Sequence, residues 1–186
     1  MNHVNKVTDN TEVFKMTKMT SAYANKLIKK LEEDKDYLRN KENESCVYTA
    51  GEGEEPLIPD YDFAKVAKEI DEIDCKICTI KHAINLANVT SKIDIDGEEF
   101  TVDAILVRMA QLNKRKITLD SMRRRQPKTR LNSSYASIKK PVVEYTYTNY
   151  DIELAKAEYE QIDNLISKMQ LQLDKYNQTV EFEVEI

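Results

Sequence analysis

Two stretches of the chain carry apolar residues at alternating spacings of three and four, the pattern of a helix with one buried stripe. One stretch runs from about Asp60 to Val89 and the other from about Asn149 to Asn177. We call each stripe a seam, because the same spacing aligns the contact positions of coiled coils. The seam residues are Phe63, Val66, Ile70, Ile73, Ile77, Ile80 and Ile84 in the first helix, and Ile152, Tyr159, Ile162, Ile166, Met169 and Leu173 in the second.

Two further helices are predicted from less regular patterns. A helix over residues 21–43 has its apolar stripe interrupted by Asp34, and a helix over 102–125 is interrupted by Lys116. Pro127 ends the latter, because its ring clashes with the preceding turn of a helix. The seams of the other two helices are uninterrupted, so we expect those two helices to pair with each other.

The spacing changes to strict alternation in two places, which predicts strands with one covered face. These strands lie near residues 135–148, as an extended arm, and near 180–186. We expect the C-terminal strand to pair with the arm or with a neighbouring subunit. The segment around Asp96 and Gly97 suits either a small hairpin or a tight turn into the next helix, with Thr101 as a plausible N-cap.

The fold class follows from these elements. We predict a mainly α protein whose long antiparallel helices form a coiled-coil or four-helix-bundle-like stalk, with a small β-hairpin or arm and a C-terminal strand. A content of only 3 Gly and 4 Pro favours long helices as well. We expect a flexible tail over residues 1–20 and a single elongated helical domain over 21–186.

The order of these features resembles an uncharacterised bacterial family called septicolysin-like. The similarity covers the acidic loop Gly51-Glu52-Gly53-Glu54-Glu55-Pro56, the long helix ending near Asn88, Asp96-Gly97, and Phe100-Thr101 at the start of a helix. It continues through the basic stretch Arg123 to Arg130, the arm ending in Val142-Val143, and a last helix with Leu154 and Leu165. The resemblance implies a helical, coiled-coil-like architecture, and it carries no catalytic residue or ligand. The family name suggests a cytolysin, but the two strand-like segments are short and interleaved with Thr or Glu, unlike a membrane-inserting segment.

Charge is unevenly distributed along the chain. The formal net charge is -5, yet residues 108–130 contain nine basic residues and only Asp120 as an acid, so this block carries +8 and the remainder -13. The block either pairs with acidic helices or binds a polyanion such as nucleic acid, and we favour the first explanation. The candidate polyanion-binding residues are Arg123, Arg124, Arg125, Lys128 and Arg130.

Three soft-metal ligands share one stripe of the helix that begins near Asp60. Cys75, Cys78 and His82 lie three and four residues apart. A structural zinc site needs a fourth ligand, which the sequence does not obviously supply, and the three residues lie opposite the seam. They are a weak metal candidate, and we expect neither a metal nor another cofactor.

The sequence contains no phosphate-binding Gly loop, no nucleophile elbow and no HExxH motif, so we do not expect an enzyme. It also lacks an apolar run long enough to span a membrane. We expect a bacterial, cytoplasmic protein of unknown biochemical function. The leading hypothesis is a structural or interaction protein that forms homo-oligomers, with another protein as a second candidate partner. A nucleic-acid-binding module is the alternative, and a metal-binding or cytolytic protein is less favoured.

Overall fold

The computed structural model describes residues 16–131 and 143–186, and this part of the chain is mainly helical, as predicted. Whereas the sequence predicted one domain over 21–186, the chain divides into two compact units. The first unit contains the described residues up to Asn88 together with Lys175–Ile186, and the second contains Val89–Asp174. The helices are α1 (Ser21–Ser45), α2 (Phe63–Thr90), α3 (Val102–Arg123) and α4 (Ile152–Thr179), and the strands are β1 (Met16–Thr20), β2 (Lys92–Ile95), β3 (Glu98–Thr101), β4 (Lys128–Arg130), β5 (Tyr145–Tyr147) and β6 (Glu181–Glu185).

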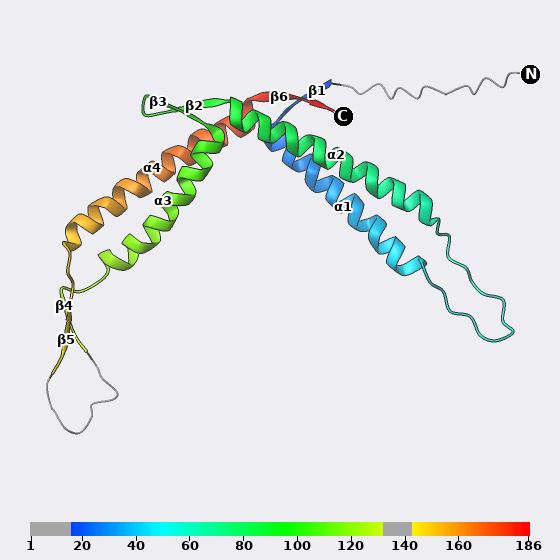
Figure 1. The fold of residues 1–186 in the computed structure, drawn as a ribbon, viewed down its shortest axis with the longest axis horizontal. Helices are drawn as coiled ribbons and strands as arrows, with labels where there is room; N and C mark the ends of the chain where they lie inside the picture. Colours follow the sequence, from blue (N-terminus) through cyan, green and yellow to red (C-terminus); the bar gives the residue numbers. More distant parts are fainter. Residues whose placement is uncertain (1–15, 132–142) are drawn as a thin grey trace, which may run out of the picture. The chain divides into compact units, whose positions relative to one another are not determined.

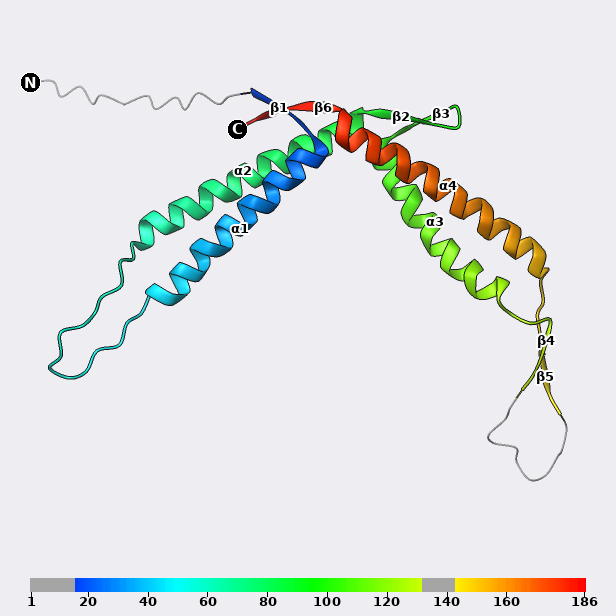
Figure 2. The same cartoon turned by 180° about the vertical axis from the view of Figure 1, so that it is seen from behind.

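In the first unit, α1 and α2 lie side by side as an antiparallel hairpin (Figures 1 and 2). The ammonium group of Lys35 lies 2.6 Å from the carboxylate of Asp74, and that of Lys81 lies 3.6 Å from the carboxylate of Glu32. Beneath these ion pairs an apolar core joins the two helices to β1 and β6. The core residues are Met19, Ala24, Ile28, Ile77, Ile80 and Val184.

Strands β1 and β6 form an antiparallel ladder in which Met19 lies opposite Phe182 and Thr17 opposite Val184. The predicted alternation of the C-terminal strand is confirmed, because Val184 is buried while Glu183 and Glu185 are exposed. Its predicted partner was wrong. The strand pairs with residues 16–20, for which the sequence predicts a flexible tail because this stretch is polar and only weakly periodic.

In the second unit, α3 and α4 form another antiparallel hairpin (Figures 1 and 2). Strands β2 and β3 form a two-stranded hairpin that leads directly into α3. Its turn residues Asp96 and Gly97 have φ values of 55° and 91°, as a two-residue hairpin turn requires. Ile93 and Ile95 are buried on one face of this hairpin.

The connection between α3 and α4 contains a second β-ribbon, in which β4 pairs with β5 and Thr129 lies opposite Thr146. The predicted arm is therefore confirmed at residues 145–147. Its partner strand is residues 128–130, whereas the predicted upstream strand at 135–140 lies outside the described residues.

Polar caps explain where the two seam helices begin. Asp62 accepts a hydrogen bond from the Lys65 amide, and Asp151 accepts bonds from the amides of Glu153 and Leu154. Such side-chain caps satisfy amides that lack a partner inside the helix. The helices consequently start at Phe63 and Ile152, about three residues later than predicted.

The predicted pairing of the two seam helices was wrong. The seam of α2 contributes Ile77 and Ile80 to the core shared with α1, and α4 forms ion pairs with α3. Each long helix therefore packs against the helix that is its neighbour in the sequence. The periodicity identifies which face of a helix is buried, but it does not identify the partner that covers this face.

Candidate interaction surfaces

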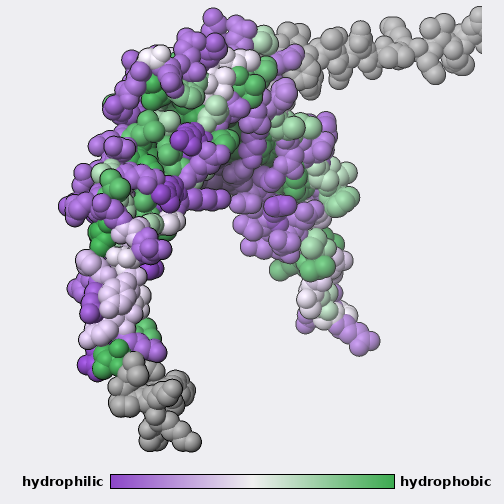
Figure 3. Space-filling view, turned by 60° about the vertical axis from the view of Figure 1, so that its left-hand side comes forward, coloured by the Kyte–Doolittle hydropathy of each residue, from purple (hydrophilic) through white to green (hydrophobic). Residues whose placement is uncertain are grey.

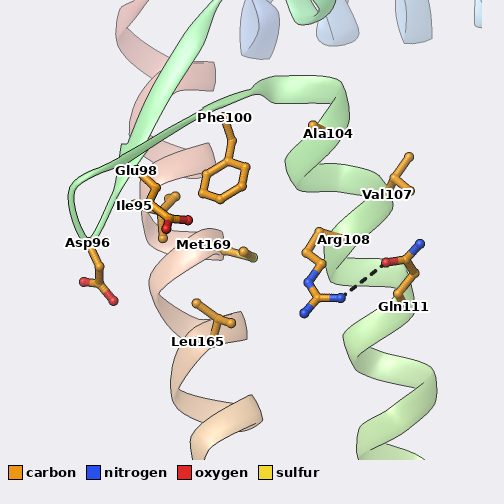
Figure 4. Close-up of a pocket in the computed structure, with 10 residues that line it drawn as sticks. All are labelled: Ile95, Asp96, Glu98, Phe100, Ala104, Val107, Arg108, Gln111, Leu165 and Met169. Atoms are coloured by element: carbon orange, nitrogen blue, oxygen red, sulfur yellow. Dashed lines mark hydrogen bonds between the residues drawn. The ribbon is translucent and has the colours of Figure 1, made fainter.

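A groove runs between α3 and α4, below the β2–β3 hairpin, and its upper part has a volume of about 670 Å³. Figure 4 shows Phe100 pointing into the groove from the strand above, with Leu165 and Met169 pointing in from α4. Ala104 and Val107 line the α3 side. Val107 lies at the edge of the groove and is 59% exposed, so this edge has apolar surface in contact with solvent.

One cation lies in this apolar groove. Figure 4 shows the guanidinium of Arg108 between the two helices, 3.5 Å from the side-chain oxygen of Gln111. Arg108 forms no ion pair within the described part of the chain. Its positive charge is therefore available to a partner. At the upper rim, Lys168 donates to both carboxylate oxygens of Asp96, at 3.0 and 2.7 Å.

The groove continues along the hairpin toward an arginine fork. Arg115 donates two hydrogen bonds of 2.9 Å to the two carboxylate oxygens of Glu158. This hydrogen bonding lowers the pKa of Glu158 and raises the pKa of Arg115. Leu112 and Ile162 lie in the same lower stretch of the groove, which adds about 350 Å³.

The lysine that interrupts the apolar stripe of α3 finds a counter-charge on α4. Lys116 forms an ion pair with Asp163, and its ammonium lies 5.6 Å from the centroid of the Tyr159 ring. The hydrogen bond to Asp163 raises the pKa of Lys116. The interruption therefore marks a polar contact between the helices, which explains why an otherwise apolar face contains a charge.

Two of the five candidate polyanion-binding residues are engaged within the protein. Arg123 donates to Asp120 at 2.9 and 2.7 Å, and its guanidinium lies 3.9 Å from the centroid of the Tyr159 ring. Arg124 also donates to Asp120, at 3.0 Å. Hydrogen bonding, mainly from Arg123, lowers the pKa of Asp120. Arg123 thus holds the end of α3 against α4, while Arg124 remains 70% exposed at the edge of this cluster.

The other three candidates lie beyond the end of α3: Arg125 in the connection that follows the helix, and Lys128 and Arg130 on β4. The ammonium of Lys128 is 4.0 Å from the centroid of the Tyr145 ring and 5.4 Å from that of Tyr147. Arg125 and Arg130 are exposed and form no side-chain hydrogen bond or ion pair with the described residues. The structure therefore brings Arg125, Lys128 and Arg130 together at one end of the hairpin and assigns Arg123 to the helix contact.

The seam residues mostly lie at contacts within the chain. Val66, Ile77, Ile80, Met169 and Leu173 are buried. Phe63 is 67% exposed, because it is the first residue of α2 and lies outside the helix-helix contact. The remaining seam residues are partly buried: Ile70, Ile73, Ile84, Ile152, Tyr159, Ile162 and Ile166. A role of these residues in forming oligomers stays a prediction.

The weak metal candidate Cys75, Cys78 and His82 lies on an exposed face of α2. Across residues 16–131 and 143–186, no group of three or more His, Cys, Asp or Glu side chains is arranged to hold a metal ion. In the same residues, no helix combines the length and the apolar character that crossing a bilayer requires.

The groove itself was not predicted from the sequence. In the sequence, Arg108 is one member of the basic block and Phe100 is a residue just before a helix. Because the groove needs the β2–β3 hairpin, α3 and α4 together, no spacing within one segment could reveal it. The excess of basic residues on α3 and of acidic residues on α4 was the available signal.

Comparisons with known proteins support the fold alone. No family model matches the chain, and no curated protein matches it, so the resemblance to the septicolysin-like family stays a prediction. A crystal structure of a functionally unknown conserved protein from Corynebacterium diphtheriae is similar, with a TM-score of 0.57 and 13% sequence identity. The match covers 89% of this chain and 99% of that protein.

Proposed function

We propose that this protein is a structural or interaction protein that self-associates through its helices, and that the groove between α3 and α4 is the contact. The observation that carries the proposal is an apolar groove open to solvent, with Arg108 unpaired among the described residues. Exposed apolar surface in contiguous patches is typical of protein contacts. Figure 3 shows green apolar surface on the second hairpin, interrupted by purple polar residues.

A second copy of the chain suits this groove because the two helices carry opposite charge. Helix α3 has five basic and two acidic residues, whereas α4 has five acidic and three basic residues. If a two-fold axis runs parallel to the helices, α3 of one copy lies opposite α4 of the other. Two helical hairpins would then form a four-helix bundle with a shared apolar centre.

We also propose that the protein is cytoplasmic. Cys46, Cys75 and Cys78 are exposed free thiols. Exposed thiols persist in a reducing compartment, whereas secreted proteins tend to contain disulfides.

The test is the oligomeric state of Val107→Glu, measured by sedimentation over a wide concentration range. We expect the wild type to dimerise, and the variant to dimerise at least about tenfold more weakly because a carboxylate enters the apolar contact. The matched control is Leu171→Glu on α4, because Leu171 is 68% exposed and does not line the groove. A monomeric wild type, or equal weakening by both variants, would contradict the proposal.

A further inference from the structure

The end of the second hairpin is strongly basic. Residues 121–148 contain seven basic residues and Glu144 as the single acid, a net charge of +6 within a protein of net charge -5. In the described residues of this segment we define the basic tip as a surface of cations around the β4–β5 ribbon. The basic tip consists of Arg124, Arg125, Lys128 and Arg130.

The cations of the basic tip are directed to solvent and are only partly neutralised. Arg125 and Arg130 have no acidic partner among the described residues, and Lys128 lies over tyrosine rings. Arg124 shares Asp120 with Arg123 and keeps most of its surface exposed. By contrast, Arg115 and Lys116 each form an ion pair with one carboxylate of α4. Pairing with α4 therefore explains Arg115 and Lys116, whereas Arg125, Lys128 and Arg130 have no such carboxylate partner among the described residues.

Hydroxyl groups lie next to two of these cations, Arg124 and Arg125. A pocket of about 380 Å³ is lined by Arg124, Arg125, Thr129, Thr146 and Thr148, among others. Guanidinium forks and threonine hydroxyls are among the side-chain groups that donate hydrogen bonds to nucleic-acid phosphates. The chemistry of this pocket fits a phosphodiester better than it fits an apolar ligand.

We propose that the basic tip binds the phosphate backbone of double-stranded DNA. A two-stranded ribbon has dimensions that fit along the major groove, where phosphates lie on either side of it. The tyrosine rings of the ribbon favour a duplex over a single strand, because Lys128 covers Tyr145 and approaches Tyr147. The face of Tyr145 that Lys128 covers is thus less available for stacking with an unpaired base. This proposal concerns a different surface from the groove and does not depend on self-association.

The expected binding is weak, independent of sequence and strongly salt-dependent. Four phosphate contacts, one for each cation of the basic tip, correspond to a slope of about -3.6 in a plot of log K against log salt concentration. The slope measures the number of phosphates contacted, so it is the most direct readout of the proposal.

The experiment is a salt titration of the full chain by fluorescence anisotropy, with a labelled mixed-sequence DNA duplex as the probe. The variant is Arg125→Ala with Arg130→Ala, which leaves the Lys128 contact with Tyr145 in place. We expect affinity at low salt to fall at least about tenfold and the slope to become shallower by about 1.8, since each lost contact accounts for about 0.9.

The matched control is Lys30→Ala with Lys76→Ala, which removes the same charge from exposed positions on α1 and α2. This control should keep the wild-type slope. Circular dichroism melting of both variants verifies that each is folded, as expected for exposed side chains. Single-stranded DNA of equal length and polyglutamate serve as competing probes, and both should bind less tightly than the duplex.

Three results would overturn the proposal. They are the absence of duplex binding at low salt, an equal loss in the two double variants, and binding of the single strand or of polyglutamate at least as tightly as the duplex. The last result would indicate a stacking surface or an acidic protein partner instead.

Discussion

At the scale of single residues, the contact between α3 and α4 combines apolar side chains with paired charges. Ile105 and Leu119 are fully buried, and Arg115 and Lys116 lie between them in the sequence with carboxylate partners on α4. An exposed ion pair usually contributes little to stability, but a bidentate arginine fork also restricts geometry. These pairs therefore help to determine which faces of the two helices meet.

The lowered pKa values of Glu158 and Asp120 predict how the second unit responds to acid. A carboxylate whose pKa is lower in the folded state stabilises the fold above its unfolded pKa, and this contribution is lost as the pH falls through the folded pKa. We expect the midpoint of urea unfolding to fall as the pH drops below the ordinary carboxylate range. In Glu158→Gln this dependence should be weaker.

The control for this pH series is Glu160→Gln, which changes an exposed carboxylate on the same helix that accepts no hydrogen bond from an arginine among the described residues. Its pH dependence should match that of the wild type. If Glu158→Gln also retains the full pH dependence, the ion pair with Arg115 does not contribute to folding.

At the scale of elements, two helices begin directly where a strand ends. Strand β1 leads into α1 at Thr20, and β3 leads into α3 at Thr101. Each half of the described chain also has the same order of strand, helix, connection, helix and strand. The two threonines occupy equivalent N-cap positions, but only the hydroxyl of Thr20 accepts a hydrogen bond from a helix amide, that of Tyr23 at 3.3 Å.

This difference leads to a paired prediction. Thr20→Ala should lower the free energy of unfolding by about 1 kcal/mol, because the capping hydrogen bond is lost. Thr101→Ala is the comparison, and it should cost less because no side-chain cap is present. Chemical denaturation of both variants measures the difference. Equal losses would show that the Thr20 cap contributes no stability of its own.

At the scale of the whole molecule, each compact unit contains its own fully buried residues. Ile80 belongs to the core of the first unit, and Leu119 is completely buried in the second. Of the described residues, twenty large hydrophobic side chains are exposed, whereas eighteen hydrophobic residues are buried. Cores this small make each unit sensitive to a single cavity.

Cavity mutations should act within the unit that contains them. We expect Leu119→Ala to cost about 2 to 5 kcal/mol and to raise amide exchange in α3 and in the part of α4 before Lys175. Ile80→Ala should instead raise exchange in α1 and α2. Hydrogen exchange with mass spectrometry measures both effects.

Ile117→Ala is the control on α3, since this side chain is 73% exposed and should change stability by less than about 0.5 kcal/mol. Exchange that rises equally in all helices would contradict two separate cooperative units.

The helices, their buried faces and the alternation of the C-terminal strand can be predicted from the sequence. These features depend on local periodicity, which matches the geometry of one helix or one strand. Tertiary structure alone decided the partners: α2 packs on α1, β6 pairs with β1, and Lys116 meets Asp163. Pairing depends on contacts between residues far apart in the chain, and several helices with similar seams satisfy the same local pattern. The same reason applies to the groove at Arg108 and to the contact that separates Arg123 from the basic tip. Each is formed by side chains from different elements, which only the fold brings together.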